Sequence, residues 1–408
     1  MRANTRWLIL ALLFAVRLTM ALQFESVAAI SPVVMQEFGV KVADVGILIS
    51  VYLAPGLIIA PAGGEIGRHF RDKSVVAWGL VLMIGGGLIM ALASSWSWQL
   101  AGRLLGGTGG VLLNVLMAKM VADWFADKEI STAMGIFVNS WPVGIALALL
   151  ILPPLASTSG TTGAYLATSL AGALALVSLC ALYRAPPART APGHGERWPA
   201  GATFVAVLIA GCIWGLYNAA LGMVFGFGTA MLAERGWGLT AAGSIISLVL
   251  WLVGFSVPVG GIWADRAGRH VAVMLCGLAL FAATLAIASR TEHVTLWFVA
   301  LGLVSGIPAG PIMSLPARVL GRESRAAGMG IFYMMYYAMA VAGPIAAGYI
   351  AGLAGTSQAA FDSGVIMLVG CFVAYWMFTR VRDVAGTTSQ QKRRDPPGFI
   401  RGEGKRCD

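Results

Sequence analysis

Charged residues are scarce in this 408-residue chain, where Asp, Glu, Lys and Arg together account for only 11% of the sequence. A typical soluble domain carries about 25% of these residues. Apolar residues make up 58% of the chain, too many to be hidden in a core of this size. The composition therefore excludes an ordinary soluble globular protein.

Cysteine and histidine are also rare, which removes several classes of chemistry. The five cysteines are far apart and form no Cys-x-x-Cys pair: Cys180, Cys212, Cys276, Cys371 and Cys407. Neither a disulfide framework nor a metal site is indicated. The four histidines fall between apolar runs, and the sequence has no Ser-His-Asp grouping and no Walker loop. We expect no enzyme, no cofactor and no ATP-driven pump.

The chain does contain long apolar runs with almost no charge. About twenty such residues are needed for a helix to cross a bilayer. We count twelve runs, near 7–30, 44–65, 75–95, 97–121, 131–154, 162–184, 202–229, 240–263, 271–289, 294–317, 326–352 and 360–380. The sequence predicts an all-α integral membrane protein with twelve transmembrane helices.

The net charge of +10 invites a nucleic-acid partner, but the positions of the charges indicate membrane topology instead. If both ends of a twelve-span chain face the cytoplasm, 22 of the 28 Arg and Lys residues lie in the ends and in the loops on that side. This is the positive-inside asymmetry. We expect a bacterial cytoplasmic membrane protein with both termini cytoplasmic, a lipid bilayer as its environment and no nucleic-acid partner.

Two halves of the chain resemble each other. Residues 134–137 and 329–332 both read Met-Gly-Ile-Phe, an offset of 195, and Gly64 and Gly261 are 197 apart. We therefore predict a six-helix half at 1–184, a cytoplasmic linker at 185–200, a second six-helix half at 201–381, and a disordered basic cytoplasmic tail at 382–408. A duplicated unit places a binding site between the halves near the midplane, reached by rocking one half on the other.

Residues 261–270, Gly-Ile-Trp-Ala-Asp-Arg-Ala-Gly-Arg-His, concentrate charge between two apolar runs. This pattern resembles the signature loop of the major facilitator superfamily of secondary transporters. The resemblance implies two pseudo-symmetric six-helix halves and a gate formed by Asp265, Arg266 and Arg269.

The equivalent first-half stretch at 64–73 is degenerate, because Arg68 stands at the position of the aspartate. Arginine at that place would be repelled by the helix N-terminus that the aspartate favours. Either Glu65 or Asp72 substitutes for the aspartate, or the first-half latch, meaning the charge contact of this stretch with a helix N-terminus, is weak. The sequence leaves these alternatives open.

Other landmarks carry the same resemblance. Arg103 with Gly107 and Gly109 is similar to the Arg-x-x-x-Gly-x-Gly element of the family's fourth helix, and residues 139–144 loosely resemble its fifth-helix motif. Residues 23–32, with Arg17 before them, resemble the cyanate/nitroimidazole-type porters of bacteria.

Arg17 is the sharpest candidate for substrate binding. It lies ten residues, or about 15 Å, into the first span, near the middle of a core about 30 Å thick. An arginine at that depth must face a polar cavity or a partner. The alternative is a structural pair with Glu25 or a backbone carbonyl. We expect the pocket to be completed by Asn139, Trp214, Tyr217, Asn218 and Tyr333, although packing roles are open for each.

Glu25 and Arg103 are candidates for proton coupling, with a hydrated vestibule and a structural pairing as their respective alternatives. We predict a monomeric secondary transporter that moves a small, anionic solute by alternating access, driven by the proton gradient. Two alternatives remain open: a proton-driven drug efflux transporter and a transport-inactive membrane sensor.

Overall fold

The computed structural model describes residues 3–40, 42–125, 128–185, 198–321 and 323–394. Every regular element in these ranges is a helix: α1 (Ala3–Ala29), α2 (Ser31–Phe38), α3 (Val42–Val51), α4 (Gly56–His69), α5 (Asp72–Leu92), α6 (Trp96–Phe125), α7 (Ile130–Leu182), α8 (Gly201–Glu234), α9 (Leu239–Ala267), α10 (His270–Ala288), α11 (Val294–Ser305), α12 (Ala309–Met313), η1 (Pro316–Arg318), α13 (Arg325–Ala354) and α14 (Gln358–Arg394).

Eleven stretches among the described residues are long and apolar enough to cross a membrane. One of them, α7, has 53 residues and contains two spans. Gly160 has φ 64° and ψ −164° in its middle, so the chain reverses there between the fifth and sixth spans. Only glycine adopts this backbone conformation without strain. The predicted all-α fold with twelve spans is thus confirmed.

Two of the predicted spans are broken. The second is divided into α3 and α4 by residues 52–55, and the tenth into α11 and α12 by residues 306–308. Pro55 and Pro308 lie at the ends of these breaks. Proline has no N–H to donate and disfavours a helical residue before it, so both helices stop and restart.

The C-terminal segment also differs from the prediction. We expected disorder from residue 382, but α14 continues to Arg394. Residues 387–394 contain neither glycine nor proline, and the next helix breaker is Pro396. Residues 395–408 lie outside the described residues, as does most of the predicted linker at 185–200.

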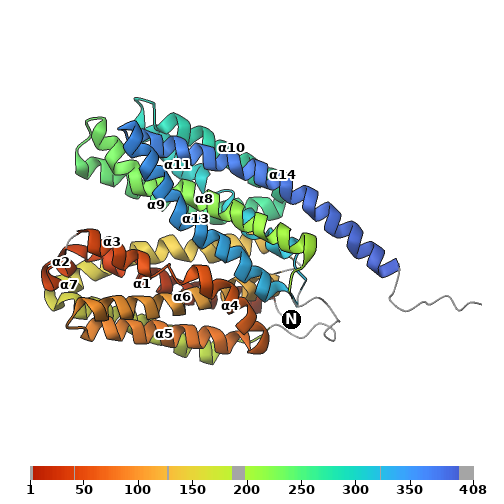
Figure 1. Ribbon diagram of the computed structural model, residues 1–408, viewed down its shortest axis with the longest axis horizontal. Coiled ribbons are helices and arrows are strands. Elements are labelled where there is room, and N and C mark those ends of the chain that lie inside the picture. The colour runs from red at the N-terminus through yellow and green to blue at the C-terminus, as the bar shows by residue number, and fades with distance from the viewer. Residues whose placement is uncertain (1–2, 41, 126–127, 186–197, 322, 395–408) are drawn as a thin grey trace, which may run out of the picture.

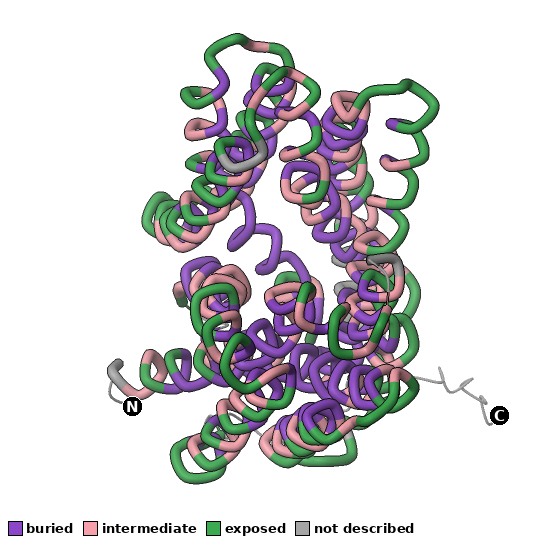
Figure 2. Tube along the Cα trace, turned by 90° about the vertical axis from the view of Figure 1, so that its left-hand side faces the viewer, coloured by how far each residue is buried: buried purple, intermediate pink, exposed green. Residues whose placement is uncertain are grey.

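The helices form two groups, α1 to α7 and α8 to α14 (Figure 1). We call the end that carries the start of α1, the α4–α5 and α9–α10 turns and the C-terminus of α14 the basic end. The groups converge at this end and diverge at the opposite end, which faces the viewer in Figure 2. Large apolar side chains such as Trp78, Leu174, Trp251 and Ile366 are exposed on the outer surface, as a lipid-facing surface requires.

Two equivalent glycines bring the groups together near the basic end. A methyl group on Gly330 of α13 would lie 2.5 Å from the carbonyl oxygen of Ala60 in α4. At Gly135 of α7 it would lie 3.0 Å from the carbonyl oxygen of Val257 in α9. The repeated Met-Gly-Ile-Phe sequence therefore marks two equivalent places where a helix of one half packs directly on the backbone of the other.

Candidate functional site

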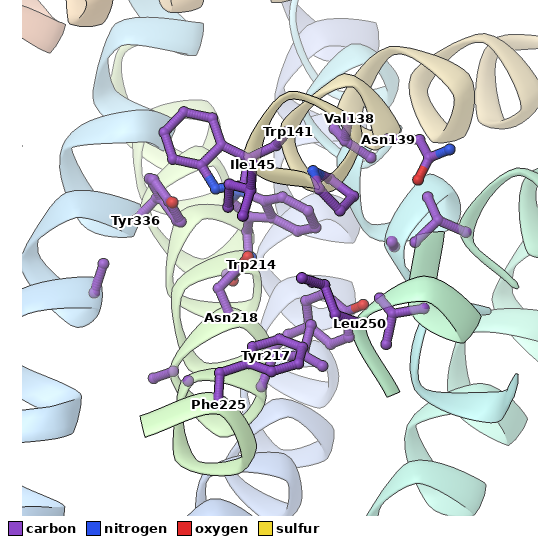
Figure 3. A pocket seen from close by; sticks show the side chains of 18 of the residues that line it. Val138, Asn139, Trp141, Ile145, Trp214, Tyr217, Asn218, Phe225, Leu250 and Tyr336 are labelled. Atoms are coloured by element: carbon purple, nitrogen blue, oxygen red, sulfur yellow. Dashed lines mark hydrogen bonds between the residues drawn. The ribbon is translucent and has the colours of Figure 1, made fainter. Parts of the chain in front are cut away.

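A cavity of about 250 Å³ lies between the two halves. Side chains of α7, α8, α9 and α13 converge on it (Figure 3). All six residues that the sequence predicted for substrate binding line this cavity: Arg17, Asn139, Trp214, Tyr217, Asn218 and Tyr333. Their roles are considered below from their contacts.

Arg17 is buried, and it is held by uncharged groups. Its Nε donates to Oδ1 of Asn114 at 2.8 Å. Its Nη1 donates to the carbonyl oxygens of Phe137 and Val138, at 3.2 and 3.0 Å, and to Oγ of Ser140 at 3.1 Å. Nη2 has no hydrogen-bond partner in the part of the chain that the structure describes. Two of the three guanidinium nitrogens are therefore fixed, and the other amino group stays available.

The helix α7 offers the carbonyl of Val138 because it contains Pro142. Proline has no N–H, so the carbonyl of Val138, four residues earlier, loses its normal helical partner. A free carbonyl within a membrane needs another donor. Arg17 of α1 supplies that donor, which explains how a proline in one helix fixes an arginine in another.

The positive charge of Arg17 has no carboxylate beside it. The residues that line the cavity include no Asp or Glu. The ring of Phe137 lies 4.8 Å from the guanidinium carbon and that of Trp141 lies 5.8 Å away, both within cation–π range. Dipoles and rings partly solvate the charge, but nothing in the cavity wall neutralises it. The site is electrically complementary to an anion.

Three other polar atoms in the cavity wall are buried without a hydrogen-bond partner: Nε1 of Trp214, the hydroxyl of Tyr333 and Oδ1 of Asn139. Buried polar groups are normally paired, and an unpaired one costs free energy. Each of these atoms has almost no solvent-accessible surface, so a bound solute would pair with them after a small side-chain movement.

Two of the predicted residues use their polar groups within the protein. The hydroxyl of Tyr217 donates to the carbonyl oxygen of Ser305 at 2.8 Å, where α11 ends. Nδ2 of Asn218 donates to the carbonyl oxygen of Trp214, one turn earlier on α8, at 2.8 Å. The ring of Tyr217 stacks on Trp214, with centroids 5.5 Å apart. Tyr217 therefore presents an aromatic surface to the cavity, and its hydroxyl is already engaged.

Asn114 links the two halves. Its Oδ1 accepts from Arg17, and its Nδ2 donates to the hydroxyl of Tyr337 on α13 at 3.2 Å. The arrangement connects the arginine of the first half to the eleventh span in the second.

Three aromatic residues of the cavity are absent from the predicted binding set: Trp141, Phe225 and Tyr336. Trp141 immediately precedes Pro142, and a proline within an apolar run was a usable signal, because broken membrane helices line cavities. Tyr336 lies three residues after Tyr333, at the spacing that puts side chains on one face of a helix. Figure 3 shows Trp141 and Tyr336 on the same side of the cavity as each other.

The two proton-coupling candidates lie outside this cavity. Arg103 is buried, and its three hydrogen bonds all go to backbone carbonyls, of Leu48, Gln23 and Phe24. These contacts tie α6 to α1 and α3. Glu25 is half-buried on α1, close enough to Arg103 to experience its charge.

At the basic end, Asp265 connects the halves. Its Oδ2 accepts from the backbone N–H of Thr132 at 2.6 Å, and its Oδ1 accepts from that of Ser131 at 3.3 Å. These are the first free N–H groups of α7, where a carboxylate is favoured. Nδ1 of His270 lies 3.4 Å from Oδ1 as well. The predicted contact between this aspartate and a neighbouring helix N-terminus is present, while Arg266 and Arg269 are exposed.

The first half has a different arrangement at this end. Asp72 pairs with Lys119 at 2.6 Å, within the same half. Asp123 of α6 contacts Lys119 at 3.5 Å and forms an ion pair with Arg325, the first residue of α13 in the other half. The side chain of Glu65 lies outside the described residues. The first-half carboxylate that reaches across to the second half is thus Asp123, which lies four residues after Lys119 on α6.

Comparison with known proteins agrees with the fold. The model of the Major Facilitator Superfamily matches residues 12–232 and 202–402. An uncharacterised transporter of that type from Mycobacterium tuberculosis is 23% identical over 354 residues, which are 84% of this chain and 78% of the relative. A probable nitrate transporter from Staphylococcus haemolyticus is 30% identical over 156 residues, covering 37% of this chain and 39% of the relative.

Among solved structures, the E. coli fucose:proton symporter superposes with a TM-score of 0.74 at 15% identity, over 93% of this chain and 99% of the symporter. The likeness is one of fold. Together with the family match over both halves, it shows that this multi-pass membrane protein belongs to the Major Facilitator Superfamily of transporters.

Proposed function

We propose that the protein moves a small anion across the membrane by alternating access, with Arg17 as the principal anion-binding group. One observation carries this proposal. A buried arginine lies in the wall of the central cavity with one amino group free, while no carboxylate lines that cavity. A permanently charged guanidinium offers an anion a charge-assisted hydrogen bond that is roughly twice as strong as a neutral one.

Coupling to protons follows from the electrical cost of the anion. Moving one negative charge into a cell that is negative inside costs about 2.3 kcal/mol per 100 mV. A proton that travels with the anion removes that cost. Glu25 is the proposed carrier, because it is a half-buried carboxylate on the same helix as Arg17. Arg103 would act on it through its charge, since its own hydrogen bonds are committed to backbone carbonyls.

The relatives are compatible with an anionic substrate. One partial relative is a probable nitrate transporter. The resemblance of residues 23–32 to cyanate/nitroimidazole-type porters leads to the same class of solute. From this resemblance we propose only the class of solute, a small anion or planar molecule.

The test compares Arg17 variants in proteoliposomes with an imposed pH gradient. Nitrate, cyanate, acetate and benzoate serve as probes, and uptake and thermal stabilisation are both measured. We expect Arg17→Ala to abolish uptake of whichever anion the wild type carries. Arg17→Lys keeps the charge but not the planar fork, so it should retain partial binding. Uptake by the alanine variant at the wild-type rate and affinity would make Arg17 structural and refute the proposal.

The aromatic wall of the cavity favours one second candidate, proton-driven efflux of hydrophobic drugs. Trp141, Trp214, Phe225 and Tyr336 would suit such molecules. In that case lipophilic cations or neutral dyes would stabilise the protein better than anions, and Arg17→Ala would leave their transport intact. If no probe moves at all although solutes bind, a sensor is the remaining interpretation.

We also propose that the basic end faces the cytoplasm of a bacterial cell, with both termini on that side, and that the protein acts as a monomer. The support for this orientation is the excess of Arg and Lys at this end. A single cysteine at residue 194, in a background without other cysteines, should resist an impermeant maleimide in intact cells. Labelling there would reverse the orientation.

A further inference from the structure

The groups that line the cavity limit the chemical class of the anion more narrowly than the charge of Arg17 does. Three hydrogen-bond donors of this wall are unoccupied, Nη2 of Arg17, Nε1 of Trp214 and the hydroxyl of Tyr333, and so is one acceptor, Oδ1 of Asn139. Trp214 and Tyr333 are only 6% and 1% exposed. All three groups can donate, and none of the residues lining the cavity is an acid. Because donors outnumber the single free acceptor, a ligand head that mainly accepts hydrogen bonds suits this set.

The number of charges limits the head to a single negative one. Arg17 is the only Arg or Lys among the residues that line the cavity. A dianion would leave one charge against rings and aliphatic side chains, and burying an unpaired charge is costly. The polar neutral groups are also few, because Tyr217 and Asn218 donate to backbone carbonyls. A sugar acid, with a hydroxyl on nearly every carbon, would leave most of them without partners.

The rest of the wall suits a flat apolar body. Trp214 stacks on Tyr217 at 5.5 Å, and Tyr336 lies 6.2 Å from Trp214 between ring centroids. Figure 3 shows Trp141 and Ile145 on the opposite side of the cavity from Tyr217 and Phe225. Aromatic pairs favour offset or edge contacts with another ring.

The size of the cavity agrees with this body. One water molecule needs roughly 10–15 Å³ of such space. A cavity of about 250 Å³ would therefore hold many waters beside an inorganic anion of three or four atoms. Those waters would lie against apolar rings, which is unfavourable. An organic ligand that fills the space avoids that cost.

We infer that the substrate is an aromatic monocarboxylate, whose carboxylate is bound by Arg17, Trp214 and Tyr333 and whose ring lies against Tyr217 and Tyr336. This inference rests on the proposed function, because it assigns a chemical class to the anion that Arg17 binds. It adds two residues that donate hydrogen bonds to the carboxylate, Trp214 and Tyr333. It also adds an aromatic wall that favours ring-bearing acids over small inorganic anions.

The test is calorimetric titration of the purified full chain in lipid nanodiscs with five probes: benzoate, phenylacetate, acetate, nitrate and benzamide. We expect benzoate or phenylacetate to bind at least about tenfold more tightly than acetate or nitrate, since burying a ring is worth more than 1.4 kcal/mol. Benzamide has the same shape without the charge and should bind at least about tenfold more weakly than benzoate.

Two variants test the hydrogen bonds. Trp214→Phe and Tyr333→Phe keep a ring but lose the donor, and each should raise the benzoate dissociation constant by about tenfold, the loss of one hydrogen bond to a charged group. Trp251→Phe and Tyr349→Phe are the matched controls, because both residues are exposed on the outer surface, at 63% and 69%. The controls should bind benzoate within twofold of the wild type.

The outcomes separate this inference from the proposed function. If nitrate and acetate bind as tightly as benzoate and lose binding in Arg17→Ala, the anion proposal stands and the aromatic class is refuted. If benzamide binds as tightly as benzoate, Arg17 does not distinguish a charged from a neutral ligand. Both the anion proposal and the aromatic class are then refuted. Absence of binding by both aromatic acids, or unchanged benzoate binding in both donor variants, also overturns the inference.

Discussion

The two helix starts at the basic end receive a carboxylate from the opposite half in different ways. At the start of α7, Asp265 accepts hydrogen bonds from two backbone N–H groups. At the start of α13, Asp123 pairs instead with the guanidinium of Arg325. The glycine contacts beside them, at Gly135 and Gly330, are equivalent. Packing between the halves is thus repeated, while the charges that hold the halves together are not.

The charges are in fact exchanged between equivalent positions. Arg68 stands 197 residues before Asp265, and Arg318 stands 195 residues after Asp123. Each half therefore carries one carboxylate and one arginine at these two places, but in opposite order. The degenerate loop at 64–73 does not leave the first half without a contact to the second, because the end of the fourth span provides one. The two contacts should differ in strength, since a buried ion pair is costlier to break than a charge–dipole contact.

The largest effect is expected from Asp123→Asn. The side chains of Asp123 and Arg325 are 8% and 9% exposed, and removing one member of such a pair costs about 3–5 kcal/mol. The variant leaves Lys119 paired with Asp72 and takes the carboxylate partner away from Arg325. The basic end should open, and a cysteine placed at Gly222 in the cavity should become reactive to maleimide from that side.

A double variant checks that the effect comes from the unpaired charge. Arg325→Gln combined with Asp123→Asn removes both charges, so it should restore much of the closed state that the single variant loses. Maleimide labelling that is the same in the single variant and the wild type would show that the pair does not hold this end closed.

An intermediate effect is expected at the glycines, and it should be unequal. Alanine at Gly330 places a methyl group 2.5 Å from a backbone oxygen, and alanine at Gly135 places one at 3.0 Å. Overpacking of this kind costs about 1–3 kcal/mol. Transport by Gly330→Ala should fall about tenfold, and by Gly135→Ala less. Gly352→Ala on α13 is the control, because nothing lies within 4 Å of a methyl group there. Equal transport in all three variants would contradict a role for close approach.

The sequence predicted the architecture because its signals are local or periodic. Apolar runs gave the spans, and a repeated tetrapeptide gave the halves. The two broken spans were missed or only partly anticipated, since a proline can either kink a membrane helix or end it, and neighbouring helices decide which. The extension of α14 to Arg394 was missed because polar composition alone does not exclude a helix.

The sequence predicted which residues line the candidate site, but not which hydrogen bonds they form. Depth alone indicated that Arg17 must face polar groups, because a charge at midspan has no other stable place. Its partners could not be found that way: the carbonyl of Val138 is 121 residues away and is free only because of Pro142. The engaged hydroxyl of Tyr217 likewise depends on the break after Ser305. The pairing of Asp123 with Arg325 joins residues 202 apart, across two halves whose register the sequence does not define.

The smallest effect is expected from Asp265→Asn. Asparagine keeps one oxygen that can accept from the start of α7, but it loses the charge that the helix N-terminus favours, a contribution of at most about 1–2 kcal/mol. It also removes the negative charge beside His270. Because the residue lies at a turn, membrane insertion and expression should remain normal. Transport should slow by up to about tenfold, and the cavity cysteine at Gly222 should be labelled from the basic end more than in wild type but less than in Asp123→Asn.

Adding Asp265→Asn to Asp123→Asn should increase labelling further, because the two contacts hold different helix starts and their free energies should add. Transport and labelling identical to the wild type, at normal expression, would show that Asp123 alone closes this end and that the loop at 261–270 is not a latch.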